Sequence, residues 1–132
     1  ILASCGGSKN MLTLSSLNGE WNITEVDGQK ITDKKMPFIG FDVAQKRIYG
    51  NSGCNRMMGS FDVNAKPGTI DLGALASTRM ACPDMTTEQN VLNALGQVKS
   101  YKKLGKHNMA LCNASNRPVV VLQKKASLTY LH

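Results

Sequence analysis

The chain of 132 residues has 42% hydrophobic residues and a formal net charge of +7, from 16 Lys and Arg residues against 9 Asp and Glu residues. This length and composition fit one compact domain and exclude a disordered chain, and no uninterrupted apolar run reaches the roughly 18 residues of a membrane-spanning helix. The positive charge favours an anionic partner, although lysine runs such as Lys102, Lys103 and Lys106 more often form a solvated surface. Only Tyr101 lies among these lysines as a stacking platform, so we expect no nucleic-acid partner.

The N-terminal segment resembles a bacterial lipobox. Leu2, Ala3 and Ser4 occupy the three positions before Cys5, and a polar, glycine-rich stretch follows. We therefore expect Cys5 to be lipidated, residues 1–16 to be a lipobox remnant with a flexible tether, and residues 17–132 to be a single domain. Gly6 after the cysteine resembles outer-membrane sorting, so the expected location is the cell envelope, lipid-anchored at the outer membrane. The alternative is a frayed terminus with a chance cysteine.

Several short segments rich in β-favouring residues are separated by turn signals, which is the pattern of an antiparallel meander. The clearest turn signals are Asp27-Gly28, a hairpin dipeptide, and Pro67-Gly68. The strands that we expect are Glu20–Val26 with a short return through Lys30 and Ile31, Phe38–Val43, Arg47–Gly50, Ser60–Val63, Thr69–Leu75, Ser77–Ala81, Asn108–Cys112 and Pro118–Gln123.

One segment has helical periodicity instead. Apolar residues recur at helical spacing from Val91 to Val98, and Thr86 stands three residues before Gln89, as in a capping box. The pattern predicts one main α-helix, about Thr87–Val98, whose apolar side needs a sheet to lie on. Many strands with one helix among them indicate an α+β fold.

The four cysteines are not spaced as Cys-x-x-Cys, which argues against a zinc ribbon or a thioredoxin-type motif. If Cys5 is lipidated, three cysteines remain for one disulfide in an oxidising compartment. Cys54 with Cys82 is the favoured pair because both flank expected strand ends, and Cys112 is then left over. Sequence does not fix this pairing, and the alternative is that all three are buried thiols.

Four segments together resemble the META-domain family of HslJ-type envelope lipoproteins. The residues that carry the signature are Trp21, Gly53, Cys54, Asn55, Arg56, Gly59, Met80 and Cys82, within the segments Leu17–Trp21, Gly50–Arg56, Gly59–Phe61 and Ser77–Cys82. The resemblance implies an antiparallel, curled, barrel-like sheet of short strands with one main helix packed against it. It also implies a lipoprotein linked to envelope stress or drug tolerance, with no established enzymatic activity.

The residue types of this signature favour a structural role. Glycines such as Gly50, Gly53 and Gly59 permit positive φ or close backbone approach, and the Asn55 amide can satisfy backbone groups within a bend. Trp21 is expected to be a large core residue.

Candidates for catalysis are few. His107 lies in a turn, His132 ends the chain, and no motif unites the carboxylates, so we expect neither an enzyme nor a cofactor. The expected function is a non-catalytic envelope lipoprotein domain that binds or scaffolds an unknown envelope protein or anionic ligand, as a monomer. The alternative is sequestration of a small ligand or a soft metal such as Cu(I). The sulfur residues that suggest this alternative are Met57 and Met58 near Cys54, with Met80, Cys82 and Met85.

Overall fold

The computed structural model describes residues 14–32, 36–62 and 68–125. Within these ranges the chain forms ten β-strands, a short 3-10 helix (η1) and one α-helix (α2). Cys5, the predicted lipidation site, and His132 lie outside the described residues. The elements are η1 Leu14–Leu17, β1 Gly19–Val26, β2 Gln29–Lys30, β3 Phe38–Asp42, β4 Arg47–Asn51, β5 Arg56–Asp62, β6 Asp71–Leu72, β7 Ala76–Ser77, α2 Thr86–Leu95, β8 Ser100–Lys103, β9 Asn108–Cys112 and β10 Pro118–Lys124.

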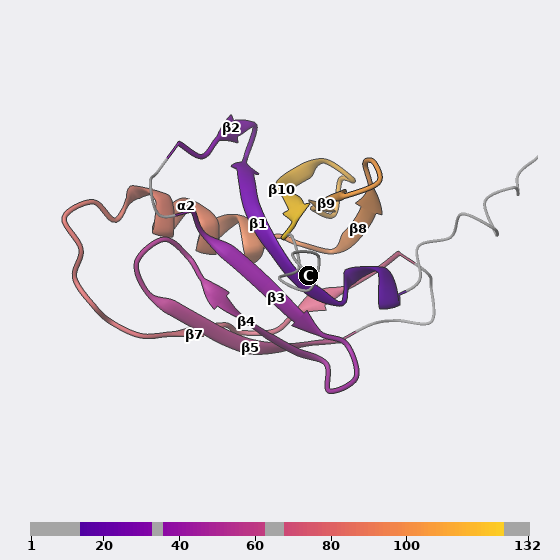
Figure 1. The fold of residues 1–132 in the computed structure, drawn as a ribbon, viewed down its shortest axis with the longest axis horizontal. Helices are drawn as coiled ribbons and strands as arrows, with labels where there is room; N and C mark the ends of the chain where they lie inside the picture. The colour runs from indigo at the N-terminus through magenta and orange to yellow at the C-terminus, as the bar shows by residue number, and fades with distance from the viewer. Residues whose placement is uncertain (1–13, 33–35, 63–67, 126–132) are drawn as a thin grey trace, which may run out of the picture.

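All strands belong to one antiparallel sheet in the order β6-β5-β4-β3-β1-β10-β9-β8, with β2 paired to β1 and β7 paired to β5. Figure 1 shows β3, β4 and β5 running side by side, with β8, β9 and β10 grouped beyond β1. The two edges of the sheet approach each other, because Thr69 forms an isolated bridge with Ser100 and the Tyr101 N–H donates to the Gly68 carbonyl. The sheet is therefore a nearly closed barrel, and the fold is α+β, as predicted.

The core fills the inside of this curled sheet. In β1, Trp21 and Ile23 are buried in alternation, but the next buried residue is Val26 rather than Glu25. The register against β10 shifts between Ile23 and Glu25, and this irregularity moves the alternation by one residue. Helix α2 contributes buried Val91, Ala94 and Leu95 to the same core and contacts β1 and β10.

The β1–β2 turn has the backbone that its dipeptide predicts. Asp27 and Gly28 both have positive φ, of 51° and 85°, which is the arrangement of a tight hairpin turn whose twist matches its strands.

The predicted helix bounds and cap need correction. Helix α2 ends at Leu95 instead of Val98, although Val98 is buried, so the apolar periodicity continues past the last helical turn. The capping box is wrong because Thr86 lies inside the helix and makes no side-chain cap. The Asp84 carboxylate accepts the Thr86 N–H at 2.9 Å instead, and this hydrogen bond holds the pKa of Asp84 below its ordinary value.

Several strand predictions also differ from the structure. β5 begins at Arg56, before the predicted Ser60; Val63, its predicted end, lies outside the described residues. Of the predicted strand Thr69–Leu75, only Asp71 and Leu72 lie in β6, and of the predicted strand Ser77–Ala81, only Ser77 lies in β7. β8 was not predicted, since its sequence Ser-Tyr-Lys-Lys offers one buried residue, Tyr101, and its pairing depends on β9. No helix in the described ranges is long and apolar enough to cross a membrane.

Candidate functional site

The signature residues around Cys54 surround a buried carboxylate. Glu88 lies in the first turn of α2 and is only 6% exposed. Its Oε1 accepts the Ser52 hydroxyl at 2.8 Å and the Asn55 backbone N–H at 2.7 Å, and its Oε2 accepts the Asn55 side-chain amide at 2.7 Å. Within the described ranges every buried side-chain nitrogen or oxygen has a hydrogen-bond partner. Both oxygens of the Glu88 carboxylate therefore accept hydrogen bonds.

These donors also determine the protonation of Glu88. Burial by itself raises the pKa of the carboxyl, but the hydrogen bonds from the Asn55 amide, the Asn55 and Cys54 backbone and the Ser52 hydroxyl outweigh it, and the pKa lies below its ordinary value. The positive end of the helix favours the same charged state. A carboxylate that is ionised and occupied by structural donors is a poor general base, because a base must accept a substrate proton.

Asn55 connects this carboxylate to the segment that precedes α2. Its side-chain oxygen accepts the Met80 N–H at 2.6 Å and the Thr78 hydroxyl at 2.7 Å, while its amide nitrogen donates to the Met80 carbonyl at 3.2 Å. The prediction that the Asn55 amide satisfies backbone groups is correct, but these groups do not lie within its own bend, where the Asn51 side chain accepts the Gly53 N–H instead. The backbone it satisfies belongs to Met80, more than twenty residues away along the chain.

A disulfide joins the same two segments. Cys54 and Cys82 are bonded, with their Cα atoms 6.2 Å apart and a sequence separation of 28. This is the pair that the sequence favours. Cys112 is a free, buried thiol on β9, and burial raises its pKa. The bond and the Asn55 contacts together fix the β4–β5 turn, residues 78–82 and the start of α2 in one unit.

The signature glycines permit close approach of neighbouring chains. Gly53 has a φ of 125°, which only glycine adopts readily. A Cβ atom at Gly50 would lie 2.2 Å from the Phe38 carbonyl oxygen, and one at Gly59 would lie 2.7 Å from a methyl group of Leu75. A larger residue at Gly50 would force β3 and β4 apart, whereas one at Gly59 would require the Leu75 side chain to shift.

The remaining signature residues lie outside the carboxylate network. Trp21 is 4% exposed and its indole N–H donates to the Leu17 carbonyl at 2.8 Å, so it anchors η1 to the barrel. The side chains of Arg56 and Met80 are exposed. The structure thus brings together Gly53, Cys54, Asn55, the Met80 backbone and Cys82.

Of the sulfur residues proposed as soft-metal ligands, Met80 and Met85 line one pocket, but Met57 and Met58 do not line it. Met57 is buried in the core, whereas Met58 is 51% exposed, because adjacent residues of a strand point to opposite faces. The disulfide occupies both Cys54 and Cys82, so the oxidised protein offers no thiolate there. Among the described residues no group of three or more His, Cys, Asp or Glu side chains is placed to hold a metal ion.

Two lysines of the sequence runs have partners within the chain. Lys99 is ion-paired with Asp71 at 3.2 Å, and the Lys124 ammonium lies 4.6 Å from the centroid of the Trp21 ring. The exposed lysines beside the β8–β9 turn are Lys103 and Lys106.

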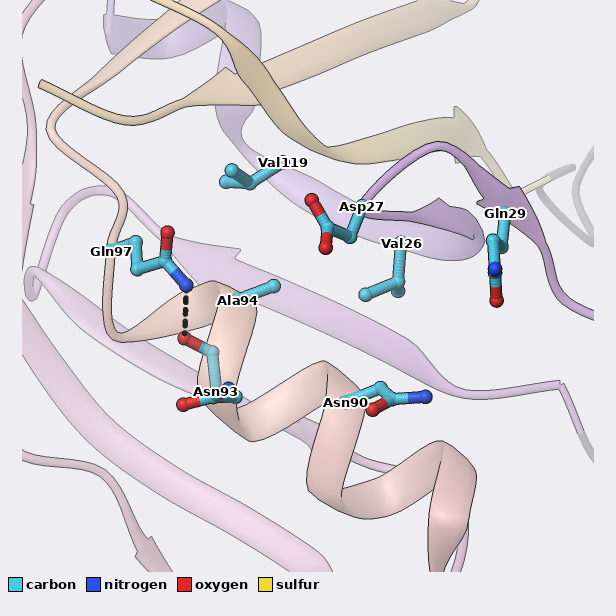
Figure 2. A pocket seen from close by; sticks show the side chains of 8 residues that line it. All are labelled: Val26, Asp27, Gln29, Asn90, Asn93, Ala94, Gln97 and Val119. Atoms are coloured by element: carbon cyan, nitrogen blue, oxygen red, sulfur yellow. Dashed lines mark hydrogen bonds between the residues drawn. The ribbon is translucent and has the colours of Figure 1, made fainter. Parts of the chain in front are cut away.

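A small pocket opens between α2 and the β1–β2 turn (Figure 2), with a volume of about 150 Å³. Val26, Ala94 and Val119 are its buried apolar residues. Among its described lining residues there is no aromatic ring and no nucleophilic hydroxyl or thiol. The polar residues around it are Asp27, Gln29, Asn90, Asn93 and Gln97. We call it the amide-rimmed pocket.

Sequence reasoning missed Glu88 as the centre of the network. The available signal was its place seven residues before Leu95 on the apolar side of the predicted helix, since a carboxylate at such a position must be satisfied by other parts of the chain.

The domain is a nearly closed antiparallel barrel with one helix. A disulfide links the turn that contains Gly53, Cys54 and Asn55 to the segment before α2, and these features together define the class of the domain. The META domain family model matches residues 12–126, and the chain belongs to this family. A search of curated proteins found no match.

Solved structures share this fold. A protein from Burkholderia xenovorans, solved by NMR, is 23% identical with a TM-score of 0.64 and 86% of each chain covered. A second NMR structure is 24% identical with a TM-score of 0.61, covering 86% of this chain and 95% of the other. A DUF4847 family protein from Bacteroides vulgatus is 13% identical with a TM-score of 0.59, covering 84% of this chain and 95% of the other. At these identities the likeness concerns the fold alone.

Proposed function

We propose that this protein is a non-catalytic binding or scaffolding domain of the bacterial cell envelope, anchored by a lipid on Cys5 and acting in stress or drug tolerance. The observation that carries the proposal is the closed network around Glu88. The polar signature residues satisfy one another, with Asn55 and Ser52 donating to the carboxylate, so the signature builds a rigid frame. A frame of this kind suits a domain that presents a surface to a partner.

The disulfide supports the location. Cys54–Cys82 is a bond of the kind that persists in oxidising compartments such as the bacterial envelope and is rare in the cytosol. The net charge of +7 supports a partner with negative charge on its surface.

Membrane fractionation of cells that express the precursor with its natural signal sequence tests the anchor, with Cys5→Ser as the variant. We expect the wild type in the membrane fraction and Cys5→Ser in the soluble fraction, because stable attachment requires acyl chains. Identical fractionation of the two forms would refute the lipid anchor.

Crosslinking in intact envelopes tests the binding role. A reproducible crosslinked partner, lost when Cys5→Ser removes the protein from the membrane, is the expected result. Turnover of a substrate by the purified protein would contradict the non-catalytic assignment.

A further inference from the structure

The outer face of the sheet carries a row of side chains that no part of the network uses. Cross-strand pairing places Met58 of β5 opposite Tyr49 of β4, Tyr49 opposite Gly40 of β3, and Gly40 opposite Glu20 of β1. Met58 is 51% exposed and Tyr49 is 39% exposed. This row is an aromatic and thioether surface that faces solvent.

The Tyr49 ring is held in place from two sides. A Cβ atom at Gly40 would lie 2.2 to 2.7 Å from three carbon atoms of the ring, so the ring occupies the space above the glycine. The Tyr49 hydroxyl donates to a Glu20 carboxylate oxygen at 3.2 Å, and the Lys125 ammonium binds the other oxygen at 3.3 Å. Partial burial and the negative charge of Glu20 raise the pKa of Tyr49, which keeps the hydroxyl a donor. The ring is preorganised, so a ligand need not order it.

A hollow of about 580 Å³ lies beside this ring. The rim of the hollow carries one negatively charged residue, Asp42, one positively charged residue, Arg47, and neutral polar residues such as Gln45. The Asp42 carboxylate accepts the Gln45 N–H at 3.2 Å with one of its oxygens, and Arg47 is exposed on the opposite strand. The residues that line the hollow are Asp42, Gln45, Arg47, Ile48, Tyr49, Met58, Gly59 and Ser60.

We propose that this hollow binds a neutral carbohydrate chain, with the apolar face of one pyranose ring on Tyr49 and its hydroxyl groups on Asp42, Arg47 and Ser60. A sugar ring has an apolar C–H face and an edge of hydroxyls that donate and accept hydrogen bonds, and the hollow offers both kinds of contact. The charges argue against other occupants. An acyl chain would desolvate Asp42 and Arg47 without pairing them, and a polyanion would meet the carboxylates of Asp42 and Glu20.

The amide-rimmed pocket fits this ligand less well. It is smaller, at about 150 Å³, and its described lining residues include no ring on which a sugar could stack. The assignment rests on the proposed function in one respect, since an envelope location is what brings glycan chains within reach.

The test uses the whole chain with Cys5→Ser and a hexamer of β-1,4-linked N-acetylglucosamine as the probe, followed by calorimetric titration and by backbone NMR shifts. We expect saturable binding with the largest shifts in β3, β4 and β5. Tyr49→Ala should weaken binding about tenfold, whereas Tyr49→Phe, which keeps the ring, should stay within about threefold. Gly40→Ala should also weaken binding, because the added methyl displaces the ring.

Two controls keep the result interpretable. Asn93→Ala, in the amide-rimmed pocket, should leave the affinity unchanged, and Arg47→Ala replaces Tyr49→Ala if the latter fails to fold by circular dichroism. The assignment would be overturned if the hexamer did not bind, or if Tyr49→Ala bound it with the same affinity as the wild type. It would also be overturned if the NMR shifts centred on Asn93, or if phosphatidylglycerol vesicles but not the hexamer shifted the signals of β4. Membrane fractionation is independent of these outcomes, so loss of sugar binding with an intact anchor would refute this inference alone.

Discussion

Replacing Glu88 by glutamine keeps the length of the side chain but removes its charge and one acceptor oxygen. In the wild type, both carboxylate oxygens accept hydrogen bonds, from Ser52 and the Asn55 backbone on one side and from the Asn55 amide on the other. In Glu88→Gln, one of the two positions becomes an NH₂ group. Whichever way the amide turns, a donor then faces a donor in a buried site.

The expected loss of stability in Glu88→Gln follows from the hydrogen bonds that the substitution removes. Hydrogen bonds to a charged group contribute about 1.5 to 3 kcal/mol each, and a buried donor left without a partner costs about 1 to 3 kcal/mol. Losing one such bond and weakening the others should therefore lower the free energy of unfolding by about 3 kcal/mol at pH 7. For a domain of this size that corresponds to a fall of about 10 °C in Tm.

The effect should depend on pH. The pKa of Glu88 is lowered in the folded state, so its contribution to stability is complete above the ordinary glutamate pKa of about 4.3 and is lost as the pH falls through the lower folded value. A protonated Glu88 resembles glutamine in carrying a donor at one of its two terminal positions. The stability gap between wild type and Glu88→Gln should therefore narrow as the pH is lowered below 4.3.

Urea unfolding of both proteins between pH 3 and pH 7 measures this gap. Glu25→Gln is the matched control, because this strand residue forms no ion pair in the described part of the chain, and it should change stability by less than about 0.5 kcal/mol. A gap near zero at pH 7, or a gap of constant size down to pH 3, would refute the reasoning.

Three further perturbations test the frame. Cys82→Ser should lower the free energy of unfolding under oxidising conditions by about 3.5 kcal/mol, from the entropy of closing the loop, and equal melting of the wild type with and without reductant would contradict this. Gly50→Ala should cost about 2 kcal/mol or more in urea unfolding because the added Cβ meets a backbone carbonyl, whereas Gly105→Ala, with its nearest neighbour at 3.9 Å, should be neutral. Trp21→Phe leaves the Leu17 carbonyl without its indole donor and should cost about 1 to 2 kcal/mol, with faster hydrogen exchange in η1; unchanged exchange there would count against the anchoring role.

Local patterns were sufficient for much of the sheet. β1, β3, β4, β9 and β10 were predicted nearly to their bounds, because alternating or continuous apolar residues and turn dipeptides act over a few neighbouring positions. The same local reasoning failed for β8 and for the short β6 and β7. These strands form mainly through their partners, with few buried side chains of their own.

The candidate site also has a part that the sequence predicted and a part that it did not. Its residue types were recognisable in the sequence, since Cys54, Asn55 and Cys82 belong to a family signature. The role of Glu88 was not, because its donors lie more than thirty residues away in the chain. The preorganised ring of Tyr49 was also not recognisable, because it depends on the register that sets Gly40 opposite it.

The sequence by itself therefore determined most of the longer strands, the presence of one helix, which residues are apolar enough to be buried, and the family to which the chain belongs. These properties come from backbone preference and side-chain periodicity, which are local. Only the tertiary structure decided the closure of the barrel, the burial of an ionised Glu88 and the hollow beside Tyr49. Each of these depends on contacts between segments distant in the chain, and such contacts have no counterpart in the spacing of neighbouring residues.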